Sequence, residues 1–375
     1  MRADYIDTRP NLVSVFSGAM GLDLGLEAAG FNPVFAADIL PAAIQTIKVN
    51  KPNICTWQGD VFELEGKHIR SMAGLLSVDV DLLAGGAPCQ SFSTAGNRRS
   101  IKDREKGFLV FEFIRLVKEL RPRAFLLENV KGILSASVKH RQLPYNNNGV
   151  IIDSWHGSVL REVVRRLRDI GYSVSFKELN AADYGVPQVR RRVFFVGYRD
   201  GVDHSFPEPT HSEKGDLLAP RWLTLKHAIG DLREDQSHCV QFSARKREIL
   251  SLVPAGGNWR NLPEELQKES MGAAYYAKGG RTGHWRRLSW EKPSPTILTE
   301  PNNAGTCLCH PVETRPLSVA ECARLQTFPD HWKFMGTGRD QYRLVGNAVP
   351  VKLAEALGRS IISRLSQAEV CTAAE

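Results

Sequence analysis

The first half of the chain alternates short apolar segments with amphipathic ones, and this alternation restricts the possible folds more than any other feature. Strands are expected at residues 12–16, 34–37, 79–84, 124–127 and 192–196, where apolar side chains run together. Helices are expected between them, for example around Phe111, Ile114 and Val117, and over a segment that Ser158 caps and Gly171 ends. Such alternation gives a mainly parallel sheet covered by helices on both faces. The sequence therefore predicts an α/β fold with a Rossmann-like sheet.

Three polar side chains stand where expected strands stop. Asp38, Cys89 and Glu128 each follow an apolar segment. Ligands of open parallel sheets bind at the carboxyl ends of the strands. The shared position predicts a binding or active site at that edge of the sheet.

Cys89 is the candidate nucleophile. It follows Gly-Gly-Ala-Pro and opens a polar loop, where a thiol is exposed and able to react. A buried, inert cysteine is the alternative interpretation. Glu128 ends a buried strand, where a carboxyl group can donate a proton to a ligand. A helix-capping acid is the alternative for Glu128.

A basic run, Gln188-Val189-Arg190-Arg191-Arg192, leads into the last of these strands. Strand alternation places Gln188, Arg190 and Arg192 on one face. Paired arginines can bind a phosphate or a carbonyl oxygen through two parallel hydrogen bonds. A solvated edge strand is the alternative.

A glycine-rich turn, Phe16-Ser17-Gly18-Ala19-Met20-Gly21, joins the first expected strand to a helix. Such a turn brings the backbone close to a bound nucleoside. Asp38 follows after about 20 residues, the distance at which an acid holds ribose hydroxyls. The turn lacks G-x-G-x-x-G and is weak support when taken alone.

The bulk properties fit a soluble, intracellular protein. The formal net charge of +8 suits a polyanionic partner without requiring one. The N-terminus is too polar for a signal peptide, and no segment reaches the roughly 20 apolar residues of a membrane helix. Seven scattered cysteines favour a reducing cytoplasm. Cys307, Cys309, His310 and Cys322 lack a second spaced ligand pair, so no metal site is predicted.

The pattern changes between residues 206 and 301, where proline, glycine and tryptophan become frequent and the periodicity fades. We interpret this region as a smaller, irregular domain. Basic and aromatic residues mix around Arg281, Arg286 and Arg287, as they do in nucleic-acid readers. The tryptophans there would equally suit a small core. Regular structure returns with a capping box at Ser318 and Glu321 and a helix over residues 352–365.

Six segments, in their order, resemble the DNA cytosine-5 methyltransferase family of bacterial restriction-modification systems. They are residues 16–21, 86–93 (Gly-Ala-Pro-Cys-Gln-Ser-Phe-Ser), 128–130 (Glu-Asn-Val), 188–192, 315–329 (Arg-Pro-Leu-Ser to Leu-Gln-Thr-Phe-Pro) and 346–350 (Gly-Asn-Ala-Val-Pro). Each is a weak pattern, but six in order over nearly the whole chain are specific. The resemblance implies a Rossmann-like S-adenosylmethionine-dependent methyltransferase fold with a smaller target-recognition domain.

The resemblance also implies the domain limits and the chemistry. Residues 1–204 would bind the cofactor and catalyse, residues 205–335 would recognise the target, and residues 336–375 would return to the catalytic domain. Cys89 would attack C6 of a cytosine flipped out of the duplex, and Glu128 would bond to its N3 and amino group. Arg192 would contact O2, with Arg190 supporting Glu128. S-adenosylmethionine would give its methyl group to C5 and leave as S-adenosylhomocysteine.

Further site residues follow from the same resemblance. The cofactor pocket would include Phe16, Gly18, Gly21, Asp38, Ile39, Asp60, Val61, Pro88, Leu109, Asn347 and Val349. DNA contacts would come from Gln90, Ser91, Arg98, Arg99, Lys102, Arg281, Arg286 and Arg287.

Two positions depart from the family pattern. Met20 replaces the first of two adjacent glycines, and Asp38 replaces a glutamate, so cofactor affinity is in question while the catalytic set is intact. Three alternatives remain: a tRNA cytosine-5 methyltransferase, a catalytically silent DNA-binding regulator and a nicotinamide-dependent oxidoreductase. The expected partners are double-stranded DNA and a separate restriction endonuclease, with no membrane and a monomeric state.

Overall fold

The computed structural model describes residues 8–88, 109–136, 157–232, 240–276, 283–302 and 308–373. The chain forms two compact units. Unit 1 comprises Met1–Asn180, Arg191–Glu208 and Ala354–Glu375. Unit 2 comprises Ala181–Arg190 and Pro209–Leu353.

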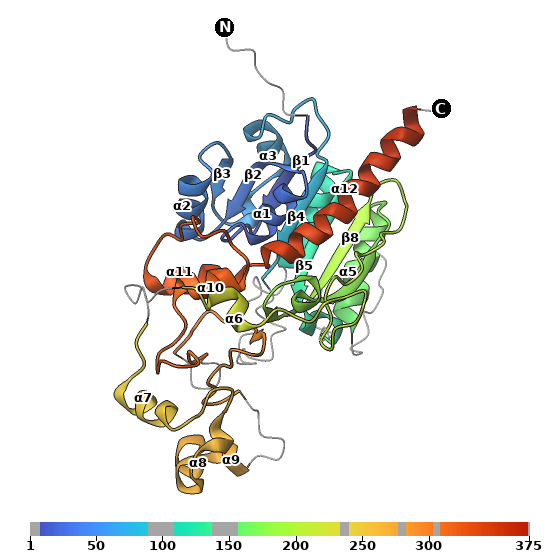
Figure 1. The fold of residues 1–375 in the computed structure, drawn as a ribbon. Helices are drawn as coiled ribbons and strands as arrows, with labels where there is room; N and C mark the ends of the chain where they lie inside the picture. The colour runs from blue at the N-terminus through green and yellow to red at the C-terminus, as the bar shows by residue number, and fades with distance from the viewer. Residues whose placement is uncertain are drawn as a thin grey trace. The chain divides into compact units, whose positions relative to one another are not determined.

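Unit 1 is built on a seven-stranded sheet with the order β3-β2-β1-β4-β5-β8-β6 (Figure 1). The strands are β1 (Asn11–Val15), β2 (Asn32–Asp38), β3 (Cys55–Gln58), β4 (Leu82–Gly86), β5 (Ala124–Val130), β6 (Ser175–Asn180) and β8 (Arg191–Tyr198). β1 to β5 pair in parallel, and β8 runs antiparallel to both of its neighbours, β5 and β6. The predicted α/β fold with a mostly parallel sheet is confirmed. The short, partly exposed strand β6 was not expected from the sequence.

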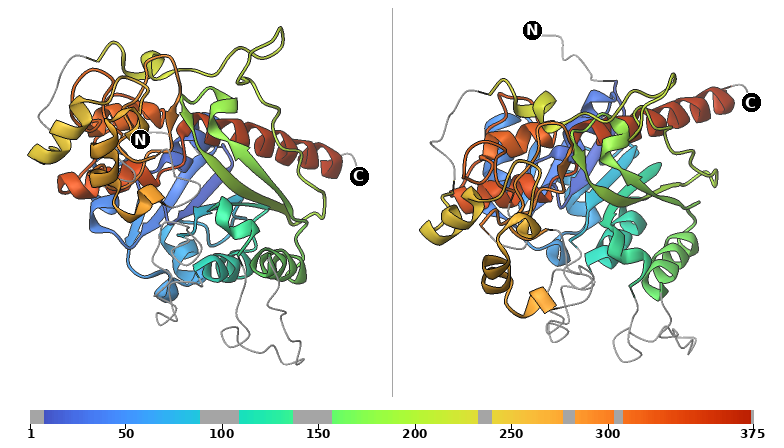
Figure 2. Two further views of the ribbon diagram at one scale, coloured as in Figure 1. Left: turned by 90° about the horizontal axis from the view of Figure 1, so that it is seen from below. Right: turned by 60° about the horizontal axis from the view of Figure 1, so that its bottom comes forward.

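Helices cover both faces of this sheet. They are α1 (Gly21–Ala28), α2 (Pro41–Asn50), α3 (Gly66–Met72), α4 (Leu109–Leu120), α5 (Ser158–Asp169) and α12 (Val351–Ala373), with short 3₁₀ segments at Val61–Glu63 and Lys131–Leu134. On one face, the side chains of α3, α4 and α5 form a single core with alternate residues of the strands, such as Val13, Leu83 and Phe125. α12 lies on the opposite face from α4 and α5 (Figure 2). It packs closely on α1, because a Cβ at Gly358 would lie 2.6 Å from Ala29 Cβ.

Several predicted helix boundaries can be compared with the structure. Gly171 ends α5 in a left-handed conformation with φ 88°, as predicted. The N-cap of α5 is Gly157, with φ 79°, and not Ser158, which is the first helical residue and is buried. A buried serine whose backbone is already helical cannot occupy the extended conformation of a cap. The capping box of Ser318 and Glu321 is confirmed at the start of helix α10 (Val319–Leu325).

Unit 2 consists of short elements joined by long irregular segments. Its helices are α6 (Leu225–Ile229), α7 (Ala244–Ser251), α8 (Glu264–Met271), α9 (Ala273–Tyr276), α10 (Val319–Leu325) and α11 (Gly338–Asn347), with 3₁₀ segments at Ala181–Tyr184 and Trp259–Asn261. A two-stranded sheet pairs β7 (Gln188–Val189) with β9 (Ser294–Pro295). A small core gathers Phe242, Ile249, Leu250, Trp259 and Trp285 with others. Within the described parts of the chain, no helix is both long enough and apolar enough to cross a bilayer.

One buried residue of unit 1 breaks the rule that buried polar groups are paired. Asp23, in the first turn of α1, is 1% exposed, and neither of its carboxylate oxygens has a hydrogen bond of normal geometry, although the Ser14 hydroxyl and the Asp23 amide lie near enough to lower its pKa. Burial raises the pKa of Asp23 from 3.8 to about 6, although the Ser14 hydroxyl lowers it somewhat. A capping acid would accept the Met20 amide, but that N–H donates to Ser17 O at 2.8 Å. Asp23 is therefore not a helix cap.

The raised pKa predicts how Asp23 affects stability. The folded protein holds this proton more tightly than the unfolded chain, so stability falls as pH rises through about 4 to about 6. Asp23→Asn removes the charge and keeps the shape. Its stability relative to the wild type should therefore rise with pH, by on the order of 2–3 kcal/mol between acidic and neutral conditions.

Thermal and urea unfolding from about pH 4.5 to about pH 8 measure this difference. The pH dependence of this stability difference is the informative quantity. Its absolute size is not, because the amide that replaces the carboxyl group is also buried without a partner. A difference that stays constant across this range would show that the pKa of Asp23 is not raised in the folded protein.

Candidate active site

The ion pair between Glu128 and Arg192 is the centre of the site. In the antiparallel pair of β5 and β8, Glu128 lies opposite Phe194 and Arg192 lies opposite Val130, so the two side chains share a face. Arg192 Nε lies 2.9 Å from Glu128 Oε1, and the two side chains are only 15% and 10% exposed. A charged pair this sheltered interacts strongly and fixes the carboxylate in one orientation.

Strand β4 contributes the space beside Glu128 and the approach to Cys89. Gly86 pairs in register with Glu128, and a Cβ on Gly86 would lie 3.1 Å from Glu128 Oε2. The missing side chain therefore leaves room for the carboxylate. Asn129 Nδ2 donates a hydrogen bond to Ala87 O at 3.2 Å. The chain that leads into Cys89 is thus tied to β5 beside Glu128.

Several predicted residues lie outside the described part of the chain. They are Cys89 and Arg281, together with Gln90, Ser91, Arg98, Arg99 and Lys102. Pro88, the last described residue before them, is exposed. The roles of these residues stay predictions.

The turn after β1 has an unusual backbone. Phe16, Gly18 and Met20 all adopt positive φ angles, of 57°, 52° and 63°. Ser17 holds the turn, since its N–H donates to Ala37 O at 3.0 Å. A Cβ built on Gly18 would meet nothing within 4 Å, so the turn faces open space. This is the cradle expected of a turn that a ligand approaches.

Asp38, at the end of β2, completes the turn. Its Oδ2 accepts the Gly18 N–H at 2.9 Å, and its Oδ1 accepts the Leu40 N–H at 2.8 Å. The carboxylate therefore fixes the backbone on both sides of the crevice between β1 and β2. Each carboxylate oxygen has a second acceptor position, so Asp38 can also receive a ligand hydroxyl.

Met20 departs from the family's glycine at a position where glycine is preferred. A left-handed conformation costs a side chain roughly 1–2 kcal/mol, and Met20 adopts it as the N-cap of α1. The side chain is completely buried, which contributes on the order of 2 kcal/mol. Burial thus offsets the backbone strain, and Gly21 continues directly into the helix.

The other predicted cofactor residues have varied surroundings. Asp60 caps a 3₁₀ turn by accepting the Phe62 N–H at 3.2 Å. Val61 is 8% exposed and packs in the core of unit 1, while Ile39 is 58% exposed. Leu109 begins α4 and is half-buried. Their contacts with a cofactor stay predictions.

The basic run does not form one strand. β7 stops at Val189 and β8 starts at Arg191, so Gln188 and Arg190 belong to unit 2 and Arg192 belongs to unit 1. Support of Glu128 was assigned to Arg190 and instead comes from Arg192. Arg190 is 2% exposed and donates to three carbonyl oxygens, those of Ile297, Gly346 and Asn347, at 3.0 to 3.3 Å. Our assignment of Arg190 was wrong, because its guanidinium serves the backbone of unit 2.

Two buried glutamines, for which we predicted no role, help Arg190 to hold the turn around residues 345–348. Gln188 Nε2 donates to Gln326 Oε1 at 3.0 Å, and its Oε1 accepts the Ile297 N–H at 3.0 Å. Gln326 Nε2 donates to Val345 O and to Ala348 O, at 2.8 and 3.1 Å. Together with Arg190, these amides fix the turn that carries the predicted cofactor residues Asn347 and Val349. Both glutamines lie in segments that resemble family motifs, and this could have marked them as important. Their roles could not be predicted, because they depend on partners distant in the sequence.

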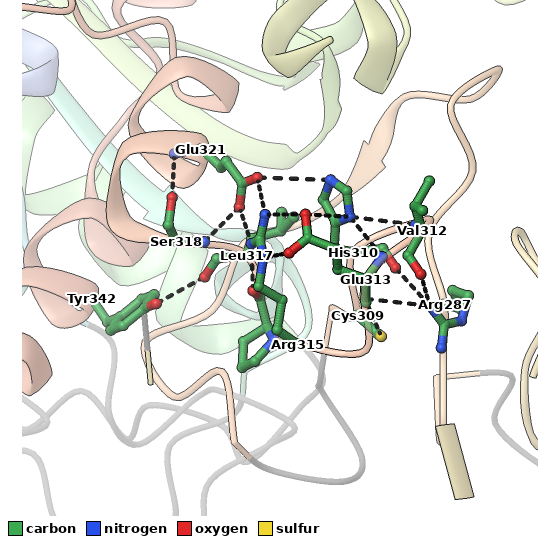
Figure 3. A network of polar contacts seen from close by, with 11 residues as sticks. Arg287, Cys309, His310, Val312, Glu313, Arg315, Leu317, Ser318, Glu321 and Tyr342 are labelled. Carbon is green, nitrogen blue, oxygen red and sulfur yellow. Dashed lines mark hydrogen bonds and ion pairs between the residues drawn. The ribbon is translucent and has the colours of Figure 1, made fainter. Parts of the chain in front are cut away.

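Arg287, which we predicted to contact DNA, is instead a buried hub of hydrogen bonds. It is 5% exposed. Its guanidinium donates to Leu250 O, Val253 O, His310 O, Val312 O, Glu313 O and Thr314 Oγ1 at 2.6 to 3.3 Å. Figure 3 shows Arg287 beside His310, Val312 and Glu313. No donor is left for a base edge, so the prediction of a reading role for Arg287 was wrong. The hub joins α7 to the segment before α10.

A second network continues from this hub to α10 (Figure 3). Arg315 binds Glu321 through two hydrogen bonds of 2.8 and 2.9 Å and also pairs with Glu313. His310 Nδ1 accepts the amides of Val312 and Glu313 at 3.3 and 3.1 Å. Burial lowers the pKa of His310. Because Nδ1 accepts these two amides, the ring hydrogen lies on Nε2, which is 3.8 Å from Glu321 Oε1.

The neighbouring residues divide between core and surface. Trp285 is 6% exposed and belongs to the core of unit 2, as the alternative interpretation held. Trp290 packs edge-on against His310 with ring centroids 5.3 Å apart. Cys309 is completely buried, and its Sγ lies 3.5 Å from Glu313 O. Arg286 is half-buried, and its contact with DNA stays a prediction.

The comparisons with known proteins decide the family. The profile of the C-5 cytosine-specific DNA methylases matches residues 11–363, which is most of the chain. The chain belongs to this family. The predicted enzyme class, a DNA cytosine-5 methyltransferase, is therefore confirmed.

Individual relatives agree with this assignment. The Type II methyltransferase M.Eco47II of Escherichia coli is 39% identical over 366 residues, which cover 95% of this chain and 79% of the relative. M.Sau96I of Staphylococcus aureus is 35% identical over 95% of this chain and 76% of its own length. A DNA modification methyltransferase encoded within an E. coli prophage has a similar fold, with a TM-score of 0.65 at 23% identity over 95% of this chain and 99% of that one. S. pombe Dnmt2 shares the fold with a TM-score of 0.57 at 18% identity, over 95% of this chain and 99% of that one.

The hub predicts a large effect of Arg287→Met on the stability of the methyltransferase. The variant leaves buried carbonyls without donors, which we expect to cost more than about 3 kcal/mol in the free energy of unfolding. Urea unfolding measures the loss. Arg286→Met is the matched control, because it removes the same charge from the adjacent, half-buried position and should cost clearly less. Equal stability of Arg287→Met and the wild type would show that the hub is not formed.

Proposed function

We propose that this methyltransferase transfers the methyl group of S-adenosylmethionine to C5 of a cytosine flipped out of a specific duplex sequence. The observation that carries the proposal is the Glu128–Arg192 pair on β5 and β8, next to the strand that leads into Cys89. The curated relatives of similar length are named Type II methyltransferases. We therefore assign this protein to the modification half of a restriction-modification system, with a separate endonuclease as its counterpart.

The proposed chemistry begins with the thiolate of Cys89. C5 of cytosine is a poor nucleophile, and addition of the thiolate to C6 makes C5 enamine-like. Glu128, in its protonated form, donates its hydrogen to N3 and accepts a hydrogen bond from the amino group, which stabilises the electron density that moves onto the ring. Arg192 keeps Glu128 in place and offers its remaining donors to O2. After methylation, a base removes the proton from C5, and the electron pair expels the thiolate from C6.

This reaction requires the cytosine to leave the helix. Neither C5 nor C6 can be approached from above or below inside a stacked duplex. Unstacking costs a few kcal/mol, which the contacts of the pocket with the flipped base must offset. The orientation of the Glu128 carboxylate before binding reduces the cost of forming those contacts.

The residues at the end of β1 and β2 fit S-adenosylmethionine. Gly18 leaves open space at the turn, and Asp38 stands where ribose hydroxyls are received. The first N–H groups of α1 are free of helical partners and suit the carboxylate of the methionine moiety. When bound, the cofactor supplies an electrophilic methyl group on a positively charged sulfur.

We assign sequence reading to the irregular segment of unit 2, residues 206–301. The catalytic pocket receives only the flipped cytosine, so flanking bases must be read elsewhere, from the groove edges. Arg287 is unavailable, but Arg247 and Arg260 are exposed in this segment. Arg281 and Arg286 remain candidates beside them.

The test of the catalytic proposal is Cys89→Ala. We expect this variant to lose methyl transfer completely and to keep DNA binding, because only the nucleophile is removed. Transfer of labelled methyl groups to plasmid DNA, with tRNA as a parallel substrate, measures the activity. DNA with 5-fluorocytosine should trap the wild type covalently, since fluorine cannot leave as a proton does. Turnover by Cys89→Ala would exclude the covalent route.

The test of the recognition proposal is a graft. The segment over residues 206–301, taken from a relative of different specificity, should transfer that relative's target sequence while Cys89 and Glu128 stay unchanged. Bisulfite sequencing of methylated plasmid identifies the target. An active chimera that keeps the parent's target would place recognition in residues 98–106 or 135–157.

A further inference from the structure

Asp23 is a buried carboxyl group that the mechanism above does not use. Its ionised form is disfavoured by burial, so the residue reduces stability at neutral pH. Leucine, asparagine or serine would avoid this cost. Local features that reduce stability concentrate at functional sites. A bound ligand of positive charge would offset this cost.

The position of Asp23 relates it to the cofactor turn. It lies in the first turn of α1, whose N-cap, Met20, is the last residue of the positive-φ turn. The nearby Ser14 hydroxyl of β1 lowers its pKa, and Ser14 Oγ lies 2.8 Å from Ser17 Oγ within the turn itself. The first-turn side chains of a helix point toward its N-terminus. The Asp23 carboxylate is therefore linked to the turn through Ser14.

The surrounding protein offers no cation to this carboxylate. Among the residues that the structure describes, Asp23 forms no ion pair, and β1 and β4 carry no titratable side chain. Glu27, one helical turn further on, raises the pKa of Asp23 and is itself paired with Lys51 of α2 at 2.6 Å. On β2, Asp38 accepts two backbone amides.

The packed helix α12 does not supply the missing charge either. Its Arg359 pairs with Glu355 one turn away, at 2.6 Å. The contact of α12 with α1 is made by Gly358 against Leu26 and Ala29. Within the described part of the chain, no cation thus faces this carboxylate, and only the Ser14 hydroxyl and the Asp23 amide stabilise its charged form.

We propose that Asp23 is the counter-charge for the sulfonium of S-adenosylmethionine, and that it makes the protein prefer the methyl donor over the product. The proposal rests on the proposed function in requiring this cofactor at the turn. The donor and S-adenosylhomocysteine have the same adenosine, amino and carboxylate groups and differ by the methyl group and the positive charge on sulfur. A fixed negative charge therefore attracts the donor and not the product. After methyl transfer this attraction is lost, which favours release of the product.

The preference should depend on the ionisation of Asp23. Binding of the cationic donor favours the carboxylate, so Asp23 releases a proton to solvent when the donor binds below its folded-state pKa. The ratio of the two dissociation constants, product over donor, should rise with pH through about 6. The amino group common to both ligands cancels in this ratio.

Calorimetry with S-adenosylmethionine and with S-adenosylhomocysteine, from about pH 5 to about pH 8, tests the proposal on the full-length protein. Asp23→Asn should lower the ratio of product to donor dissociation constants by roughly fivefold to tenfold at neutral pH. It should also make the ratio independent of pH. In the wild type near pH 6, donor binding should release protons, seen as a binding enthalpy that depends on the buffer, and in Asp23→Asn this release should disappear.

Two controls separate this role from a structural one. Glu27→Gln removes an acid from the same helix and should leave the ratio unchanged. Asp38→Asn should weaken both ligands equally, because both carry the ribose. An analogue with an ammonium group in place of the methylsulfonium should behave as the donor does.

The outcomes are distinguishable. If the wild type binds both ligands and Asp23→Asn leaves the ratio and its pH dependence unchanged, Asp23 is not the counter-charge. If the wild type binds neither ligand in the presence of DNA, the proposed function itself fails.

Discussion

The neighbours of β5 determine what the carboxyl edge of the sheet can do. β4 pairs with β5 in parallel and places Gly86 beside Glu128, so the carboxylate has room. β8 pairs with β5 in the opposite direction and places Arg192 on the face of Glu128. If β8 ran parallel to β5, its first residues would lie at the opposite edge of the sheet, away from Glu128. The single reversed strand is thus what brings a strand's first residues, with their guanidinium, to the edge where the other strands finish.

The loops of unit 2 are fixed in a different way, because this unit has little regular secondary structure. Buried amides and guanidinium groups take the place of a sheet. Gln188, Gln326 and Arg190 hold one turn, and Arg287 holds the segment before α10. Each of these groups bonds mostly to the backbone, so the loops are fixed in shape by buried side chains. Buried polar networks of this kind specify a structure only when all their members are satisfied.

Much of unit 1 could be predicted from the sequence, since strand and helix periodicity is local. The placement of Asp38 at the end of a strand followed from it, whereas Glu128, also expected at a strand end, lies within β5, which continues to Val130. The direction of β8 did not follow from periodicity, because no local pattern shows whether a buried strand between two neighbours, here β5 and β6, runs parallel or antiparallel to them. In unit 2, adjacent arginines look alike in the sequence. Arg287 contacts carbonyl oxygens from distant segments of the chain and Arg286 is half-buried beside it. This difference is a property of the tertiary structure.

The arginine hub also bears on how this unit can change during evolution. Five of the six acceptors of Arg287 are backbone carbonyls, which every amino acid provides. The residues that supply them can therefore be substituted freely in type as long as the chain keeps its path. Arg287 would stay constant among relatives without any partner position varying in step with it. Methods that find contacts from correlated substitutions would not detect the most connected residue of the unit, while the exposed positions around it remain free to acquire new sequence preferences.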